Sequence, residues 1–274
     1  YIIKFSMKKK LNLNGNFLFE KGYEVIKIPT FLKKSITKSI IKMLNEKIKC
    51  HDKNIGNIKK LNNFTNPVLS LNDAQFRNEF GHVAKRFLDF QTSQRINNWV
   101  KKNINKKLNA KFASLVYPSK YERKVNKKIK AKQFDCYFRC VRPNFNTDVG
   151  TPHRDSGFWK VLPTNDQHKA PIKYKKIYKI WIPIHGCNKK NSLRIISESH
   201  RDKNIKTKYI KKNNRKKPFI ELKKIKNLKK RTIQPISNFN NEAILFTDNS
   251  VHFAPPNLGA NKLRISTEFT VVTE

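Results

Sequence analysis

The sequence predicts a mostly β protein with α-helices at its N-terminal end. Apolar residues recur at helical spacing through the first 110 positions. Beyond about residue 112 the pattern changes to short alternating runs that turn residues separate. Many short strands of this kind are typical of a sandwich or barrel of antiparallel strands.

The N-terminal part begins with a strand and continues as helices. Residues 23–28 alternate as a half-buried strand does. Apolar spacing then predicts three helices, which cover about 35–48, 70–90 and 93–108. Ser70 or Asn72 can cap the second helix, and Ser93 can cap the third. Residues 51–68 are polar and contain Asn, Gly and Pro, so we expect a loop there.

A double-stranded β-helix, that is, a jelly-roll or cupin-like core, is one such fold, and it is the one we expect for the remaining chain. Its β-like runs lie at 113–117, 133–142, 158–162, 177–184, 193–196, 232–236, 243–247 and 263–272. A basic insertion at 201–231 interrupts them and contains only a weak apolar thread. We expect this insertion to be either a solvated loop or helix, or a lid over the site. The whole chain, 1–274, is then a single domain in which a mainly helical segment, 17–110, buttresses the core, 111–274.

Two polar side chains follow the strand expected over 133–142. The chain reads Thr-Pro-His-Arg-Asp at 151–155, and residues two apart in an extended chain point to the same side. His153 and Asp155 therefore offer an imidazole and a carboxylate to one point. These are two thirds of the 2-His-1-carboxylate set that holds non-haem Fe(II) and leaves positions open for reactants. Alone the pair is a weak signal, because surface loops contain His-x-Asp by chance.

The C-terminal part supplies the missing groups. His252, which follows the strand expected over 243–247, can be the third ligand. Arg264 lies twelve positions later, beyond a Pro-Pro-Asn-Leu-Gly turn, so its strand can return beside the one that carries His252. Arg264 and Ser266 share a face of that strand. A guanidinium beside a hydroxyl suits a dicarboxylate, because arginine binds a carboxylate in a bidentate way.

Together these residues resemble the Fe(II)/2-oxoglutarate-dependent oxygenases, and in particular their phytanoyl-CoA dioxygenase-like branch. Further segments that resemble this branch are the Trp-containing strand at 181–184, the runs at 191–193 and 197–200, and the opening strand at 22–26 with the helix after it. Ser192 stands where glycine is usual, and Ser197-Glu198 stands where Pro-Gly is usual. The resemblance covers most of 17–50 and 131–274.

The resemblance implies a chemistry. Fe(II) would be held by His153, Asp155 and His252. The cosubstrate 2-oxoglutarate would bind the metal through its keto oxygen and near carboxylate, with Arg264 and Ser266 at its far carboxylate. O2 would take the remaining position, and oxidative decarboxylation to succinate and CO2 would be coupled to oxidation of a substrate C–H bond. Family members that halogenate have a small residue in place of the carboxylate, so Asp155 favours hydroxylation.

Two further residues are candidates for the cosubstrate pocket. Arg139 shares a strand face with Tyr137, and an inward arginine needs an anion from cosubstrate or substrate. Trp181 lies opposite the isoleucines of its strand, where a core position is about as expected as a pocket-lining one. The remaining histidines, at 51, 82, 168, 185 and 200, are expected in solvated, structural or packing positions rather than as ligands.

Charge and composition limit the partners. The net charge of +41, from 60 Lys+Arg against 19 Asp+Glu, would suit a polyanion. The lysines are dispersed among Asn and Ile, as AT-rich codons would place them, and aromatic residues are not interleaved with them. We therefore expect no specific nucleic-acid partner. The four cysteines form no Cys-x-x-Cys pair and are expected to be reduced thiols.

No apolar run approaches the roughly 18 residues that would favour a membrane span. The stretch after Met7 is too polar for a signal peptide, so we expect a cytoplasmic protein with no membrane partner.

The function expected is hydroxylation of a small molecule. The inward Arg139 would allow this molecule to be anionic. A nucleic-acid oxidative demethylase is one alternative, although base-repairing members carry a second arginine in the C-terminal motif and 264–269 has only the first. A non-enzymatic jelly-roll binding protein is another, although it would not need Arg264. The sequence leaves the substrate and the oligomeric state open.

Overall fold

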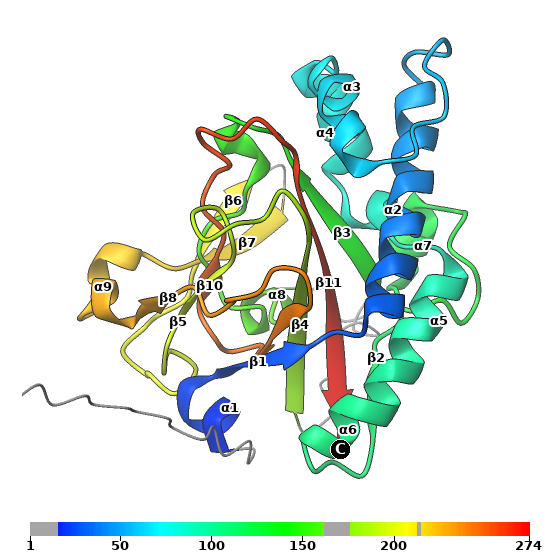
Figure 1. The fold of residues 1–274 in the computed structure, drawn as a ribbon. Coiled ribbons are helices and arrows are strands. Elements are labelled where there is room, and N and C mark those ends of the chain that lie inside the picture. The colour runs from blue at the N-terminus through cyan, green and yellow to red at the C-terminus, as the bar shows by residue number, and fades with distance from the viewer. Residues whose placement is uncertain (1–15, 162–175, 213–214) are drawn as a thin grey trace, which may run out of the picture.

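The computed structural model describes residues 16–161, 176–212 and 215–274, which form two antiparallel sheets and a layer of helices (Figure 1). His168 and the start of the chain, including Met7, lie outside the described residues. No described helix is both long and apolar enough to cross a membrane.

The helices of the described residues come mostly from the N-terminal part. They are α1 (Asn16–Lys21), α2 (Thr30–Lys49), α3 (Thr65–Leu69), α4 (Asp73–Phe80), α5 (Phe90–Trp99), α6 (Asn105–Lys107), α7 (Lys120–Val125), α8 (Ser156–Trp159) and α9 (Leu228–Arg231). The strands are β1 (Tyr23–Lys27), β2 (Ala113–Leu115), β3 (Cys136–Val141), β4 (Lys176–His185), β5 (Arg194–Ile196), β6 (Lys208–Lys212), β7 (Arg215–Phe219), β8 (Thr232–Ile233), β9 (Glu242–Thr247), β10 (His252–Phe253) and β11 (Arg264–Thr273).

The larger sheet has the strand order β1-β9-β4-β11-β2, and β3 also pairs with β11. The smaller sheet has the order β10-β5-β8, and β6 and β7 form a separate hairpin. β11 is central because it pairs with β4 along one edge and with β3 and β2 along the other. Its side chains alternate, so one set faces the helices and the other faces the smaller sheet.

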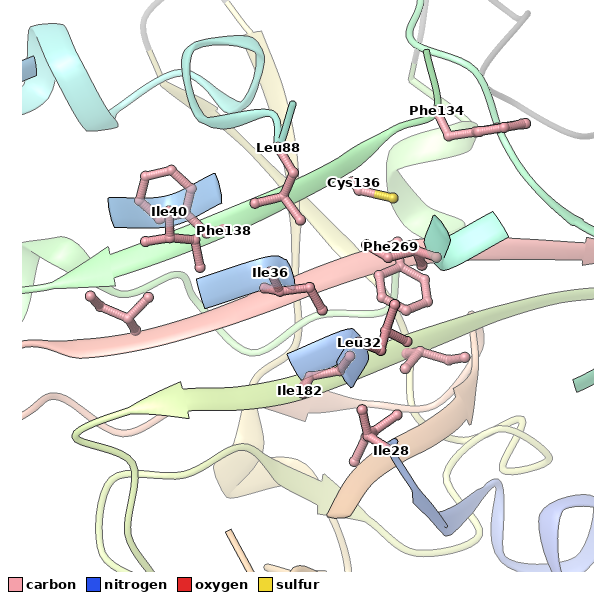
Figure 2. Close-up of a cluster of buried hydrophobic side chains, with 14 of the residues drawn as sticks. Ile28, Leu32, Ile36, Ile40, Leu88, Phe134, Cys136, Phe138, Ile182 and Phe269 are labelled. Atoms are coloured by element: carbon pink, nitrogen blue, oxygen red, sulfur yellow. The ribbon is translucent and has the colours of Figure 1, made fainter. Parts of the chain in front are cut away.

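The main core lies between the larger sheet and the helices. Figure 2 shows Leu32, Ile36 and Ile40 of α2 directed toward Phe138 of β3 and Phe269 of β11. All five side chains are fully buried. Burial of each such side chain contributes about 1.5–3 kcal/mol, which fixes the helical layer on this face of the sheet.

A second core joins the two sheets. Trp181 of β4 and Ile244 and Phe246 of β9 pack against Leu193 and Ile195, at and beside β5. These contacts set the spacing between the sheets. The arrangement is the sandwich of antiparallel strands that the sequence predicts, with helices outside the larger sheet (Figure 1).

One predicted strand is wrong. The predicted strand covers 158–162. Its first two residues lie instead in the helical turn α8. Its backbone bond runs from the Phe158 nitrogen to the Asp155 carbonyl (2.9 Å), and the Phe158 ring packs edge-on against His153. Five residues are too few for periodicity to decide between strand and turn, so tertiary contacts decide.

The third helix begins earlier than predicted. α5 starts at Phe90, because the Asp89 carboxylate accepts a hydrogen bond from the Thr92 nitrogen (2.9 Å) and caps it. Ser93, the expected cap, is fully buried within the helix and donates to the Phe90 carbonyl (2.8 Å). Both residues are good caps in isolation, and the packed position of Ser93 excludes it.

Other helix limits also differ from the prediction. α2 begins at Thr30 rather than near 35, and α4 ends at Phe80 rather than near 90. The segment 51–68, predicted as a loop, contains a 3-10 turn and most of α3. The cap of α4 is confirmed as Asn72, which forms a capping box with Gln75.

Candidate metal centre

The two predicted histidine ligands are neighbours in space. His153 and His252 form an isolated antiparallel bridge, in which each backbone nitrogen donates to the other's carbonyl, at 3.2 and 3.0 Å. Their ring centroids lie 4.4 Å apart. His252 opens β10, whose pairing with β5 places it in the smaller sheet. The bridge therefore brings two distant parts of the chain to one point.

Asp155 completes the group. One ligand atom from each of His153, Asp155 and His252 lies within 4.8 Å of the other two, and no second group of this kind occurs among the described residues. The Nε2 atoms of the two histidines lie 3.9 and 3.6 Å from the Asp155 carboxylate oxygens. These distances are too long for hydrogen bonds but leave space for an ion.

The second nitrogen of each ring fixes its orientation. Nδ1 of His153 lies 2.6 Å from the Thr151 carbonyl, and Nδ1 of His252 lies 3.0 Å from the Ser250 carbonyl. A carbonyl only accepts, so each Nδ1 carries the proton and donates it. Both Nε2 lone pairs are then directed at the space beside Asp155. This backbone support is typical of histidines that ligate a metal.

The three side chains fit a cation because they offer only acceptors. Asp155 Oδ2 is buried and has no hydrogen-bond partner within the described part of the chain. Burial, followed by the neighbouring His252, lowers the pKa of His153 to about 4, so this imidazole is neutral near pH 7. A buried carboxylate beside this neutral imidazole would lose its hydration without compensation. Two imidazole nitrogens and one carboxylate are the donor set that suits Fe(II).

The segment that carries these ligands is held from outside by the basic insertion, 201–231, and by Ser199 just before it. The Arg154 guanidinium donates to the carbonyls of Ser199, Asp202 and Ile205, at 2.6, 3.2 and 2.8 Å. The Ile220 nitrogen donates to the Pro152 carbonyl (2.7 Å). Arg154 and Pro152 flank His153, so these contacts restrain the metal-binding backbone on both sides.

The same insertion forms the β6–β7 hairpin and a small core of its own. Of its apolar thread, Ile220 and Ile225 are buried, and Leu222 and Leu228 are partly buried. Ile205 joins them, and this core packs against Ile196 and Val251. The insertion therefore packs an apolar side on the molecule, while most of its described side chains are exposed. That the insertion opens and closes as a lid stays a prediction.

Beyond the metal ligands lies a pocket between the sheets. Its lining includes every residue predicted for the site except Asp155: His153, His252, Arg264, Ser266, Arg139 and Trp181. Trp181 is buried in the core that joins the sheets and also borders this pocket, so both interpretations of it hold. The pocket also contains Glu268, which sequence reasoning missed. The alternation of side chains along β11 could have identified Glu268, because it places Glu268 on the same face as Arg264 and Ser266.

Arg264 is a buried cation that lacks a carboxylate partner among the described residues. It is 4% exposed, and Nη1 donates to the carbonyls of Asn191 and Pro255. Burial lowers its pKa to about 10, which leaves it charged near pH 7. A buried guanidinium with carbonyl partners alone is suited to receive an anion.

Arg139 differs from the prediction in one respect. Its Nε donates to Glu268 Oε2 (3.3 Å), so the protein itself supplies a counterion. An external anion is therefore not required merely because the arginine faces inward. That Arg139 binds an external anion stays a prediction. It must be argued from the hydrogen-bond donors of Arg139 that Glu268 leaves free.

The other described histidines lie outside this group. His200 Nε2 lies 2.7 Å from the Phe19 carbonyl of α1, where a packing role was expected. His185 ends β4, and burial lowers its pKa. His82 accepts a hydrogen bond from the Ala84 nitrogen, and His51 lies 3.4 Å from the Glu79 carboxylate.

Comparisons with known proteins agree with this geometry. A family model described as phytanoyl-CoA dioxygenase (PhyH) matches residues 32–265. A search of curated proteins gives no significant match. Among solved structures, the chain is similar to Fe-bound EctD from S. alaskensis, with 12% identity and a TM-score of 0.51 over 94% of this chain and 75% of that chain. This likeness confirms the jelly-roll fold.

Two further structures are similar at lower TM-scores. EctD from S. alaskensis with 2-oxoglutarate and 5-hydroxyectoine shares 11% identity, with a TM-score of 0.49 over 94% of this chain and 74% of that one. EvdO2 from Micromonospora carbonacea var. aurantiaca, complexed with 2-oxoglutarate, shares 9% identity, with a TM-score of 0.45 over 96% and 91%.

We predict that Gly157→Ala weakens metal binding. A Cβ at Gly157 would lie 2.6 Å from the Pro218 Cβ of β7, so the hairpin or the ligand-bearing segment must move. Overpacking of this kind costs about 1–3 kcal/mol. The measurement is Co(II) affinity by calorimetry together with thermal unfolding.

Gly150→Ala is the matched control, because a Cβ there meets no atom within 4 Å. It should bind Co(II) as the native protein does. A folded Gly157→Ala protein with native Co(II) affinity would show that the hairpin does not support the metal centre.

Proposed function

Because the chain belongs to the phytanoyl-CoA dioxygenase family, we propose that this 2-oxoglutarate-dependent dioxygenase hydroxylates a small-molecule metabolite and releases succinate and CO2. The observation that carries the proposal is the convergence of His153, Asp155 and His252 on one point beside Arg264. The ligand set supports Fe(II) chemistry, and the buried arginine supports a carboxylate cosubstrate.

In this proposal His153, Asp155 and His252 hold Fe(II). When bound, the metal with 2-oxoglutarate and O2 supplies the oxidant for a C–H bond. The protein's part is to fix the ligands before the metal arrives. The carbonyls of Thr151 and Ser250 keep each Nδ1 protonated, so both Nε2 atoms are available as ligands without rotation of the rings.

Arg264 and Ser266 orient the cosubstrate. The carbonyls of Asn191 and Pro255 hold Nη1 of Arg264, which leaves its other donors for the far carboxylate of 2-oxoglutarate. Ser266 follows on the same face of β11 and adds a hydroxyl donor. Both side chains are buried, and low exposure to water strengthens each charge-assisted contact.

A small molecule is favoured over nucleic acid as the substrate. The strand that carries Arg264 has no second arginine over 264–269, as a base-repairing enzyme of this kind would have. The basic surface therefore gives only non-specific, salt-sensitive attraction to nucleic acid.

We predict that His252→Ala abolishes iron-dependent turnover of 2-oxoglutarate. The change removes one of three ligands and leaves two acceptors to hold the metal. The measurement is succinate formation with Fe(II), alongside Co(II) binding by calorimetry. His200→Ala is the control, since His200 contacts α1 rather than the metal group. Native turnover by His252→Ala would exclude His252 as a ligand.

A second prediction concerns Arg264. A charge-assisted hydrogen bond contributes about 1.5–3 kcal/mol, so Arg264→Ala should weaken 2-oxoglutarate binding at least about tenfold while Co(II) stays bound. Arg264→Lys should recover only part, because an ammonium lacks the bidentate fork. Calorimetry of 2-oxoglutarate on the Co(II)-loaded protein measures both. The assignment fails if both variants bind 2-oxoglutarate as tightly as the control, Arg77→Ala, whose side chain is exposed on α4.

A further inference from the structure

A cluster of buried charges lies beside the metal centre and has no part in the chemistry described so far. Glu268 is at its centre, on the pocket-facing side of β11. One of its oxygens, Oε1, accepts from the Tyr137 hydroxyl (2.8 Å) and from Lys179 Nζ (3.0 Å). The other, Oε2, accepts from Arg139 Nε (3.3 Å). The four residues come from β3, β4 and β11, and all border the interior between the sheets.

The cluster has more positive than negative charge. Arg139 and Lys179 share Glu268, which is the one carboxylate within ion-pair distance of either among the residues that the structure describes. A third cation, Arg86, is buried nearby, with its guanidinium 5.6 Å from the Tyr137 ring centre and Nη1 on the Phe138 carbonyl. At least one positive charge in contact with Glu268 therefore has no anion of its own.

The proposed cosubstrate does not neutralise this charge. Fe(II) with Asp155 leaves one positive charge, and Arg264 adds a second. The two carboxylates of 2-oxoglutarate cancel these two. The excess on Arg139 and Lys179 then has no anion within this group of charges. Lys179 and Glu268 are buried, so an uncompensated charge beside them is costly.

Arg139 is the member of the cluster that is open to the pocket. Its side chain is 36% exposed, whereas that of Lys179 is 3% exposed. Glu268 occupies Nε alone, and the two terminal amino groups of Arg139 make no hydrogen bond to any described residue. Arg139 lines the same pocket as His153 and His252. Its free fork therefore faces the space where the oxidised C–H bond would lie.

We propose that Arg139 binds a carboxylate of the primary substrate through these terminal amino groups, with Glu268 as the positioning residue that holds its Nε. This inference rests on the proposed function and adds a substrate class, the small carboxylic acids. A planar fork of two N–H groups matches a carboxylate better than a single point charge would. The far carboxylate of 2-oxoglutarate is the other possible source of the anion, and Arg264 is assigned to it.

The test uses the full-length protein with Fe(II) and 2-oxoglutarate. A library of matched pairs, each a small carboxylic acid and its primary amide, is screened for succinate formation above the basal rate. Acids should stimulate succinate formation and their amides should not. Arg139→Met should raise the KM for a stimulating acid about tenfold or more, as expected when a charge-assisted pair is lost. Arg139→Lys should recover part of this loss.

A binding measurement separates the two carboxylate sources. Calorimetry of 2-oxoglutarate on Co(II)-loaded Arg139→Met should give the native affinity, unlike Arg264→Ala. The control Arg77→Met alters an exposed arginine on α4 and should leave both readouts unchanged. Glu268→Gln should raise the KM for the acid without changing 2-oxoglutarate affinity, because Arg139 loses its support.

Three results would overturn the proposal. They are stimulation by amides equal to that by acids, an absence of stimulation by any acid, and a loss of 2-oxoglutarate affinity in Arg139→Met that equals the loss in Arg264→Ala. A wild-type protein with no basal, iron-dependent succinate formation would instead contradict the proposed function, so the two failures are distinguishable.

Discussion

Two backbone hydrogen bonds join His153 to His252, and the metal centre depends on this contact. The residues are 99 positions apart, and no local pattern places them together. The bridge attaches the segment after β3 to β10, and the pairing of β10 with β5 makes it part of the smaller sheet. Arg264 and Ser266 lie on β11 of the larger sheet. The packing of Trp181 and Phe246 against Leu193 therefore sets the distance between metal and cosubstrate sites.

The two walls of the pocket carry complementary groups. The wall near the bridge offers only acceptors, from two imidazoles and a carboxylate. The facing wall offers the cations Arg264 and Arg139. Glu268 lies on the same wall and contacts Arg139 and the buried Lys179. A metal would satisfy the first wall, and carboxylates from cosubstrate and substrate would satisfy the second. Metal binding is thereby linked to the stability of the fold, since the metal ligands come together only when the segment at 153–155 is paired with β10.

Much of the fold and of the candidate site could be predicted from local patterns. Alternation identified β11 and placed Arg264 and Ser266 on one face, and the His-x-Asp spacing identified two ligands. Long-range contacts could not be predicted in the same way. The turn α8 forms because Phe158 packs on His153, and Asp89 caps α5 because Ser93 is buried by its neighbours.

Ion-pair partners on neighbouring strands could not be predicted from the sequence either. Arg139 was predicted to face inward, but its partner Glu268 lies 129 positions later, and only the pairing of β3 with β11 brings them together. The hairpin β6–β7 was read as a basic insertion because its buried residues are few among many lysines. In both cases the informative contacts join residues far apart in the chain.

The most direct test of this account is a crystal structure with Mn(II) and 2-oxoglutarate, in which anomalous scattering locates the metal. We expect one ion bound to Nε2 of His153, Nε2 of His252 and the Asp155 carboxylate, with 2-oxoglutarate extending from it to Arg264. A metal bound elsewhere, or 2-oxoglutarate whose far carboxylate lies away from Arg264, would contradict the account.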